Sequence, residues 1–402
     1  MRTKVKLKGG ISLIVLVITI IVMIILAAAI ILSLSNSGII GKANKAKTDT
    51  DISNAKDLVA MAHADWMLDE AKIKENDNTI TSFSNYAEKK LQEAGYKVGA
   101  GEGAYTVTED GEVYTGLTET ARAGITAGIK IGDEVKYSAV LTAKSYTTDG
   151  SERTSTGAAD STKTQTVKTN TDYTWKYIGL GEDGSLLIAP DMTGTIGTDY
   201  QLTLGDKGGY LNGPKMLNTI CDALYTVEGK GKAQSMNIEL VNKLLEYNGP
   251  KGSYNCNCYD GERSFMEVET TEAMTIAELE TKFNSKLARD YVPEGKDLGE
   301  YESDRYEINK TSKNIKNTAN KDLVYNAKNM YWLASPCVRA YMDDGFAIFY
   351  VRYIDSRDVN QCEMFYSIGQ IRSHTYAVRP YVSLTSNIQK TTENGKTVWT
   401  LS

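Results

Sequence analysis

The sequence predicts an α+β protein in which a long N-terminal helix precedes a mixed α/β, loop-rich domain. An apolar run covers residues 11–34, and a helical stripe of apolar residues continues to residue 66. From residue 129 onward, helical and strand patterns mix with long polar stretches. With 402 residues, the chain is long enough for two or three domains.

The composition argues against several classes of function. The chain has 51 acidic and 45 basic residues and a net charge of -6, so it lacks the basic excess typical of proteins that bind nucleic acid. Only two histidines occur, His63 and His374, which is too few for most histidine-based catalytic or metal sites. We therefore expect no nucleic-acid partner, no metal, no cofactor and no enzymatic activity.

The first 34 residues predict the location of the protein. A basic leader, residues 1–10, precedes the apolar run at 11–34, which as a helix would be about 36 Å long and would cross a bilayer. The basic leader stays on the cytoplasmic side of the membrane. We expect a single helix in the cell membrane and an extracellular C-terminal domain.

The order of basic leader, Gly10 and unbroken apolar helix resembles the class III signal of type IV prepilins. The resemblance implies that a prepilin peptidase cuts between Gly10 and Ile11, that the helix is retained, and that the protein meets the pilus assembly machinery. Val15 stands where most of that family has a glutamate, which puts incorporation in a filament in doubt. A signal anchor that is never cut is the alternative.

A stripe of apolar residues indicates that the helix continues beyond the membrane. Its members recur at spacings of 3, 4, 3 and 4: Ile52, Ala55, Val59, Ala62 and Trp66. No proline occurs before Pro190, so a pilin-type helix with a transmembrane half and an amphipathic half is expected from residue 11 to about residue 75. A second helix at 83–96 and a hairpin around Gly111 would complete a small pilin-like head within 35–125.

The remaining residues, 126–402, are expected to form one ligand-binding domain. Helical patterns occur at 214–225, 236–248 and 275–288. Residues 142–174 are rich in Ser and Thr and nearly lack aliphatic side chains, which predicts a flexible insertion between two strand-like neighbours. A linker between domains is the alternative at this point.

The segment 331–384 is the most informative part of the chain. The protein has 25 Tyr beside 6 Phe and 4 Trp, and this segment is enriched in tyrosine. Its middle mixes Tyr with Ser, Asp, Asn and Arg and has little coherent period. Tyrosine with small polar residues is the mixture of antibody-like binding surfaces.

With its flanks YWLAS and AVRPYVSL, this segment resembles the variable C-terminal repeat of C-type-lectin-fold proteins diversified by retroelements. The resemblance implies a C-type-lectin-like fold for 126–402 and codons randomised at template adenines. The candidate ligand-binding residues are Arg339, Tyr341, Asp343, Asp344, Phe346, Ile348, Tyr350, Asp355, Ser356, Arg357, Asn360, Tyr366, Ser367, Arg372 and His374. A static surface domain that happens to be rich in tyrosine is the alternative.

Five cysteines, an odd number, follow the apolar run, at positions 221, 256, 258, 337 and 362. Sulfatase-modifying enzymes share the lectin-like fold and use a copper-binding cysteine pair, which Cys337 and Cys362 could mimic. Fold alone does not confer function, and no fixed constellation of catalytic groups is visible. We expect a protein that is not an enzyme.

These observations predict a pilin-like adhesin displayed on the cell surface. Its C-terminal segment would bind a protein or glycan ligand on another cell, a phage or a host surface. The alternative is a minor pilin or pseudopilin with a structural role in filament assembly or secretion.

Overall fold

The computed structural model describes residues 39–138, 145–148, 164–248, 302–303, 310–325, 328–341, 346–366 and 370–402. The chain divides into two compact units. The first comprises residues 1–98 and 107–115, and the second comprises 99–106 and 116–402. The leader, the cleavage site at Gly10 and Ile11, and the apolar run 11–34 lie outside the described residues.

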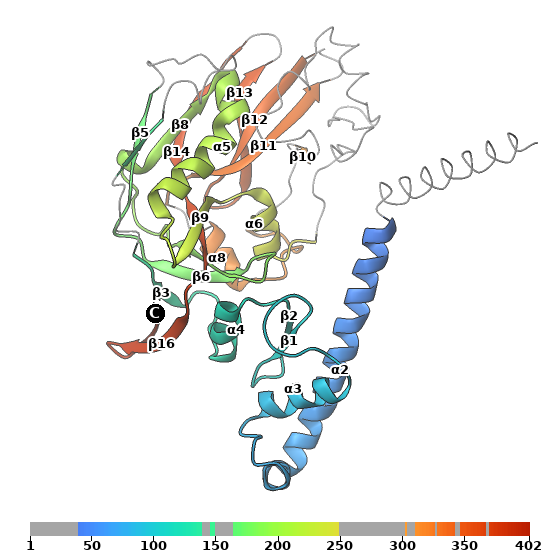
Figure 1. Ribbon diagram of the computed structural model, residues 1–402. Helices are drawn as coiled ribbons and strands as arrows, with labels where there is room; N and C mark the ends of the chain where they lie inside the picture. The colour runs from blue at the N-terminus through green and yellow to red at the C-terminus, as the bar shows by residue number, and fades with distance from the viewer. Residues whose placement is uncertain are drawn as a thin grey trace, which may run out of the picture. The chain divides into compact units, whose positions relative to one another are not determined.

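The expected fold class, an α+β protein with a long pilin-type helix and a C-type-lectin-like domain, is wrong. The described chain is a mixed α/β fold with several sheets and six α-helices (Figure 1). Strands from distant parts of the sequence pair with one another, a relationship that local periodicity does not reveal. Within the described residues, no helix is long and apolar enough to cross a membrane.

The first unit is built around helix α2 (Ile39–Asn76) and helix α3 (Phe83–Glu93). The sequence stripe supplies the packing face of α2, since Ala55, Val59, Ala62 and Trp66 are buried. The ring of Trp66 lies 5.9 Å from that of Tyr86 on α3. Non-helical backbone at Asp69 interrupts α2 near its end. Strands β1 (Tyr105–Val107) and β2 (Val113–Thr115) form a two-stranded sheet, as the turn signal at Gly111 predicts.

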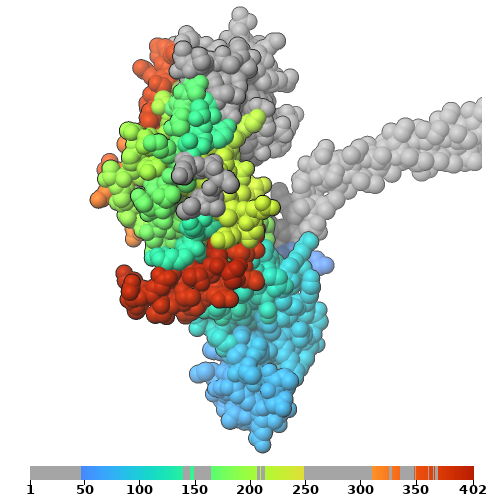
Figure 2. Space-filling model, turned by 60° about the vertical axis from the view of Figure 1, so that its left-hand side comes forward, coloured from blue at the N-terminus to red at the C-terminus, as the bar shows by residue number. Residues whose placement is uncertain are grey.

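A seven-stranded sheet forms one half of the second unit, in the order β16-β17-β3-β6-β7-β15-β9. Its strands are β3 (Glu134–Lys136), β6 (Trp175–Leu180), β7 (Leu186–Pro190), β9 (Gly231–Ser235), β15 (Pro380–Leu384), β16 (Ile388–Glu393) and β17 (Lys396–Leu401). β17 pairs with β3 in parallel, and the buried Trp399 donates from Nε1 to Asp133 Oδ2 at 3.0 Å. The C-terminal hairpin lies on the surface of this unit, in dark red in Figure 2.

A six-stranded sheet forms the other half, in the order β13-β12-β11-β14-β8, with β10 paired to β11. Its strands are β8 (Gln201–Gly205), β10 (Glu302–Ser303), β11 (Tyr331–Tyr341), β12 (Phe346–Ile354), β13 (Val359–Tyr366) and β14 (Ser373–Ala377). Helix α5 (Asp206–Tyr225) contacts β11, β12, β13 and β8. A separate ribbon of β4 (Ser145–Thr147) and β5 (Thr166–Lys168) forms the described ends of the Ser/Thr-rich segment.

The core joins the two sheets to helices α4 (Glu119–Thr126), α6 (Ile238–Leu244) and α8 (Ala319–Tyr325). The 3₁₀ turn η3 (Thr198–Tyr200) leads into β8. Arg379, in the link between β14 and β15, is 2% exposed and donates hydrogen bonds to three backbone carbonyls, those of Val324, Leu323 and Pro190. Its guanidinium carbon also lies 4.7 Å from the ring centre of Tyr331. The buried guanidinium of Arg379 therefore connects the starts of β11 and β15 with α8 and with the end of β7.

Candidate recognition surface

Strands β12, β13 and β14 bring several predicted site residues to one region of the six-stranded sheet. Tyr353 on β12 faces Asn360 on β13 across the antiparallel pair, and Trp332 on β11 faces Tyr353 from the other side. Residues directly opposite each other in neighbouring strands share a face of the sheet. These three side chains therefore lie on the same face.

Aromatic rings form a stack on this face. The ring of Tyr376, on β14, lies 4.6 Å from that of Trp332 and 4.6 Å from that of Tyr353. His374, two residues before Tyr376 on the same strand, lies 6.2 Å from it at an interplanar angle of 25°. Trp332 is fully buried and donates from Nε1 to the Leu202 carbonyl at 2.8 Å, whereas the other three rings are half-buried. The buried tryptophan thus supports a partly exposed aromatic row.

Burial keeps the groups of this row uncharged near neutral pH. It raises the pKa of Tyr353 and that of Tyr376, and it lowers the pKa of His374 despite the opposing influence of Glu363. The Cys362 thiol donates to the Tyr376 hydroxyl at 3.1 Å, and burial raises its pKa to about 12. The row can thus offer ring surface and neutral polar atoms to a ligand.

Charged and amide side chains border the aromatic row. Arg372 is exposed, and its Nε lies 3.7 Å from a carboxylate oxygen of Glu363. Glu363 is close enough to His374 to oppose the lowering of its pKa. We call this region the aromatic surface, defined as Tyr353, Asn360, Glu363, Arg372, His374 and Tyr376.

The turn between β12 and β13 is organised by Asp355. Its Oδ1 accepts from the backbone N–H groups of Arg357 and Asp358, each at 2.7 Å, and its Oδ2 accepts from Asn360 Nδ2 at 2.9 Å. This carboxylate therefore shapes the turn rather than facing a ligand. Ser356 and Arg357, at the tip, are exposed and free to make outside contacts with their side chains.

Other predicted residues are placed differently. Ile348 and Tyr350 are buried, at 4% and 3% exposure, in a small cluster against which the half-buried Tyr366 packs. Strand β11 contains Arg339 and Tyr341, and β12 contains Phe346. In the antiparallel pair, Arg339 lies opposite Ile348 and Tyr341 lies opposite Phe346. The side chains of Arg339, Tyr341 and Phe346 lie outside the described part of the structure. Asp343, Asp344 and Ser367 also lie outside the described residues.

Acidic, histidine and cysteine side chains are common metal ligands, and pairs of cysteines form disulfides. Among the described residues, no group of three or more His, Cys, Asp or Glu side chains could hold a metal ion. Cys337 lies on β11 and Cys362 on β13, and β12 runs between them, which separates their backbones by roughly 10 Å. A direct disulfide needs Cα atoms no more than about 7 Å apart, so these two residues do not form one in this arrangement.

No family model, curated protein or solved structure matches the chain.

The predicted set lacked three residues of the aromatic surface, Tyr353, Glu363 and Tyr376. It also lacked Trp332, the buried residue that supports them. Trp332 and Tyr376 lie in or beside the flanks YWLAS and AVRPYVSL, outside the middle of the segment from which the predicted residues were taken. One signal was available in the sequence: Tyr376 follows the predicted residue His374 by two positions, the spacing that places two side chains on one face of a strand.

Proposed function

We propose that this protein recognises ligands through the aromatic surface and serves in adhesion to another cell, a phage or a host surface. The observation that carries the proposal is the stacked, half-buried pair Tyr353 and Tyr376, with ring centres 4.6 Å apart. Such rings offer rigid contact area at a small entropic cost. Tyrosine and arginine are also the residues that most often dominate the energy of binding interfaces.

The border of the aromatic surface supports the same proposal. Arg372 and the Arg357 tip supply exposed positive charge, and Glu363 supplies negative charge. Charges at the rim steer encounter and set specificity, while the central rings supply most of the affinity. The ligand is a protein or a glycan, and display at the cell membrane stays a prediction because residues 11–34 lie outside the described residues.

A structural role in an assembled filament is the second candidate. Three large apolar side chains on α2 are exposed, namely Met61, Met67 and Leu68 at 67%, 75% and 84%. Exposed apolar residues on one helix favour contact with another surface. The two roles separate experimentally, because changes in the aromatic surface should abolish adhesion and leave self-association intact.

The test uses the full chain coupled to fluorescent beads and a panel of bacterial cells, host cells and immobilised glycans. We expect Tyr353→Ala and Arg372→Glu each to reduce bead binding to the recognised target at least tenfold, a loss of about 1.4 kcal/mol. Lys390→Glu, an exposed charge reversal on β16, is the matched control and should bind as the wild type. Unchanged binding in the two folded surface variants would refute the assignment of this site.

A further inference from the structure

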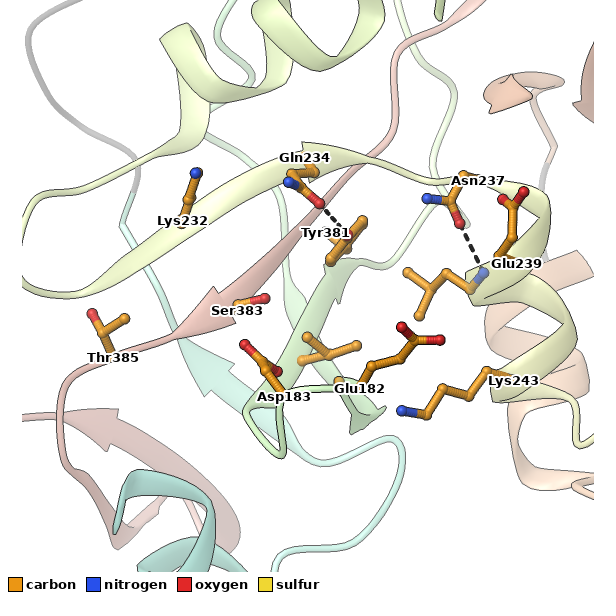
Figure 3. A pocket seen from close by; sticks show the side chains of 13 residues that line it. Glu182, Asp183, Lys232, Gln234, Asn237, Glu239, Lys243, Tyr381, Ser383 and Thr385 are labelled. Atoms are coloured by element: carbon orange, nitrogen blue, oxygen red, sulfur yellow. Dashed lines mark hydrogen bonds between the residues drawn. The ribbon is translucent and has the colours of Figure 1, made fainter. Parts of the chain in front are cut away.

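A cavity of ≈ 590 Å³ lies in the second unit and shares no residue with the aromatic surface (Figure 3). Its lining comes from the turn between β6 and β7, from β9 and β15, and from α6 with the residue before it. Small-molecule sites in proteins measure about 300 to 1,000 Å³. The cavity is therefore of a size that suits a small ligand.

The strand alternation of β9 and β15 directs a row of polar side chains into this cavity. On β15, Tyr381 and Ser383 line it while Val382 between them is buried. On β9, Gln234 and Lys232 line it, and they stand directly opposite Tyr381 and Ser383 in the antiparallel pair. Side chains of successive residues point to opposite faces of a sheet, so the face of β9 and β15 toward the cavity carries these four polar side chains.

The turn between β6 and β7 holds a carboxylate in a fixed position. Asp183 Oδ1 accepts from the Ser185 N–H at 3.1 Å and from the Ser185 hydroxyl at 2.7 Å. Gly184 follows at φ +74°, and a Cβ atom there would lie 2.0 Å from the Gly116 carbonyl oxygen. The turn is thus tightly packed, and Asp183 meets the cavity with its position already set.

Both hydrogen-bond donors and hydrogen-bond acceptors line the cavity. The Tyr381 hydroxyl donates to Gln234 Oε1, a bond that does not use the two N–H groups of the Gln234 amide (Figure 3). Burial, with the nearby carboxylates of Asp183 and Glu182, raises the pKa of Tyr381 to about 12, so this hydroxyl keeps its proton. Burial lowers the pKa of Lys243, and the same two carboxylates oppose that change.

The charges of the lining nearly cancel. Three carboxylates, those of Glu182, Asp183 and Glu239, stand with two ammonium groups, those of Lys232 and Lys243. A phosphate or another compact anion meets a carboxylate excess, and an apolar ligand would strip water from these charged groups without replacing their hydrogen bonds. A neutral ligand with many groups that both donate and accept hydrogen bonds avoids both costs.

We propose that this cavity binds a neutral saccharide of one or two residues. A sugar hydroxyl can donate to a carboxylate or accept from an ammonium or amide group, and the lining offers both kinds of group. Tyr381 adds an aromatic ring against the apolar C–H face of a sugar. This site is independent of the aromatic surface, so the protein would carry two recognition sites.

The experiment titrates the full chain with lactose, maltose and cellobiose by isothermal titration calorimetry and saturation-transfer NMR. We expect saturable binding of at least one sugar in the millimolar range or tighter. Gln234→Leu, at an exposed position, removes the amide NH2 and carbonyl groups and should weaken binding at least tenfold. Gln389→Leu, the same change at an exposed position on β16, should leave binding unchanged. Glu182→Ala, also exposed, should weaken binding about threefold or more.

Free lysine and inorganic phosphate serve as charged probes. The proposal is overturned if none of the sugars saturates up to about 50 mM, or if only lysine or phosphate binds. It is also overturned if sugar binding survives both Gln234→Leu and Glu182→Ala at wild-type strength. The substitutions in the aromatic surface lie on the six-stranded sheet, so those variants should bind the sugar normally. A loss of adhesion can therefore be told apart from a loss of sugar binding in the cavity.

Discussion

Replacing Arg379 with methionine should destabilise the second unit severely. The guanidinium is 2% exposed, and it donates to the carbonyls of Leu323, Pro190 and Val324 at 2.6, 3.1 and 3.4 Å. Methionine fills much of the volume but offers no donor, so three buried carbonyl groups lose a charged partner. The change therefore tests whether the junction of α8, β7 and β15 depends on this one side chain.

The expected loss follows from the strength of these contacts. A hydrogen bond to a charged group contributes about 1.5 to 3 kcal/mol, and the variant also removes the cost of burying a cation. The two effects partly cancel, which leaves a net loss of about 3 to 5 kcal/mol. Domains are stable by only about 5 to 15 kcal/mol, so the variant should unfold roughly 10 °C lower.

The assay is urea and thermal unfolding of the full chain in mild detergent, followed by tryptophan fluorescence and circular dichroism. Arg357→Met, at the exposed tip of the β12–β13 turn, is the matched control and should change stability by less than about 0.5 kcal/mol. If Arg379→Met stays within about 1 kcal/mol of the wild type, the carbonyl contacts do not hold this junction and the reasoning fails.

Two further outcomes are expected. Gly184→Ala should lower the free energy of unfolding by about 2 kcal/mol or more, because φ is +74° and a Cβ atom would lie 2.0 Å from the Gly116 carbonyl oxygen. Gly194→Ala, where a Cβ atom meets nothing within 4 Å, is the control and should be near neutral. Equal unfolding midpoints for the two variants would contradict the packing of this turn. Burial raises the pKa of Cys362 to about 12 and also raises that of Cys221, so both thiols stay protonated at pH 8 and should resist iodoacetamide in the folded protein. Mass spectrometry should find labelling of Cys362 only as the pH approaches its pKa or in denaturant, and rapid labelling at pH 8 would count against its burial.

Local signals in the sequence predicted local structure well. The α3 helix begins after Ser82, whose side chain accepts from the Asn85 N–H, and the hairpin turns at Gly111, where φ is +83°. Both features depend on residues a few positions apart, so pattern and turn chemistry suffice to find them. The fold class failed for the opposite reason, because it depends on which distant strands pair.

The candidate site was predicted only in part for the same reason. Composition showed that tyrosines gather near the C-terminus, but it could not say which of them face solvent. Tyr350 is buried in a cluster with Ile348 and Tyr366, whereas Tyr353, three residues later and therefore on the opposite face of the same strand, is half-exposed. Asp355 has a suitable residue type for binding, yet its carboxylate is occupied by its own turn. Burial and local hydrogen bonding are properties of the assembled sheet.

The position of β17 beside β3 has a consequence for how this protein is made. The strand that β3 needs as its parallel neighbour, β17, is encoded far downstream of β3, so it leaves the ribosome long after β3 does. Until then, β3 presents an open edge, and such edges attract other chains. Pairing between remote segments is also slow, because a long stretch of chain must close first. The seven-stranded sheet is therefore complete only after β17 has been synthesised, and a product truncated before β17 lacks the strand that covers this edge of β3.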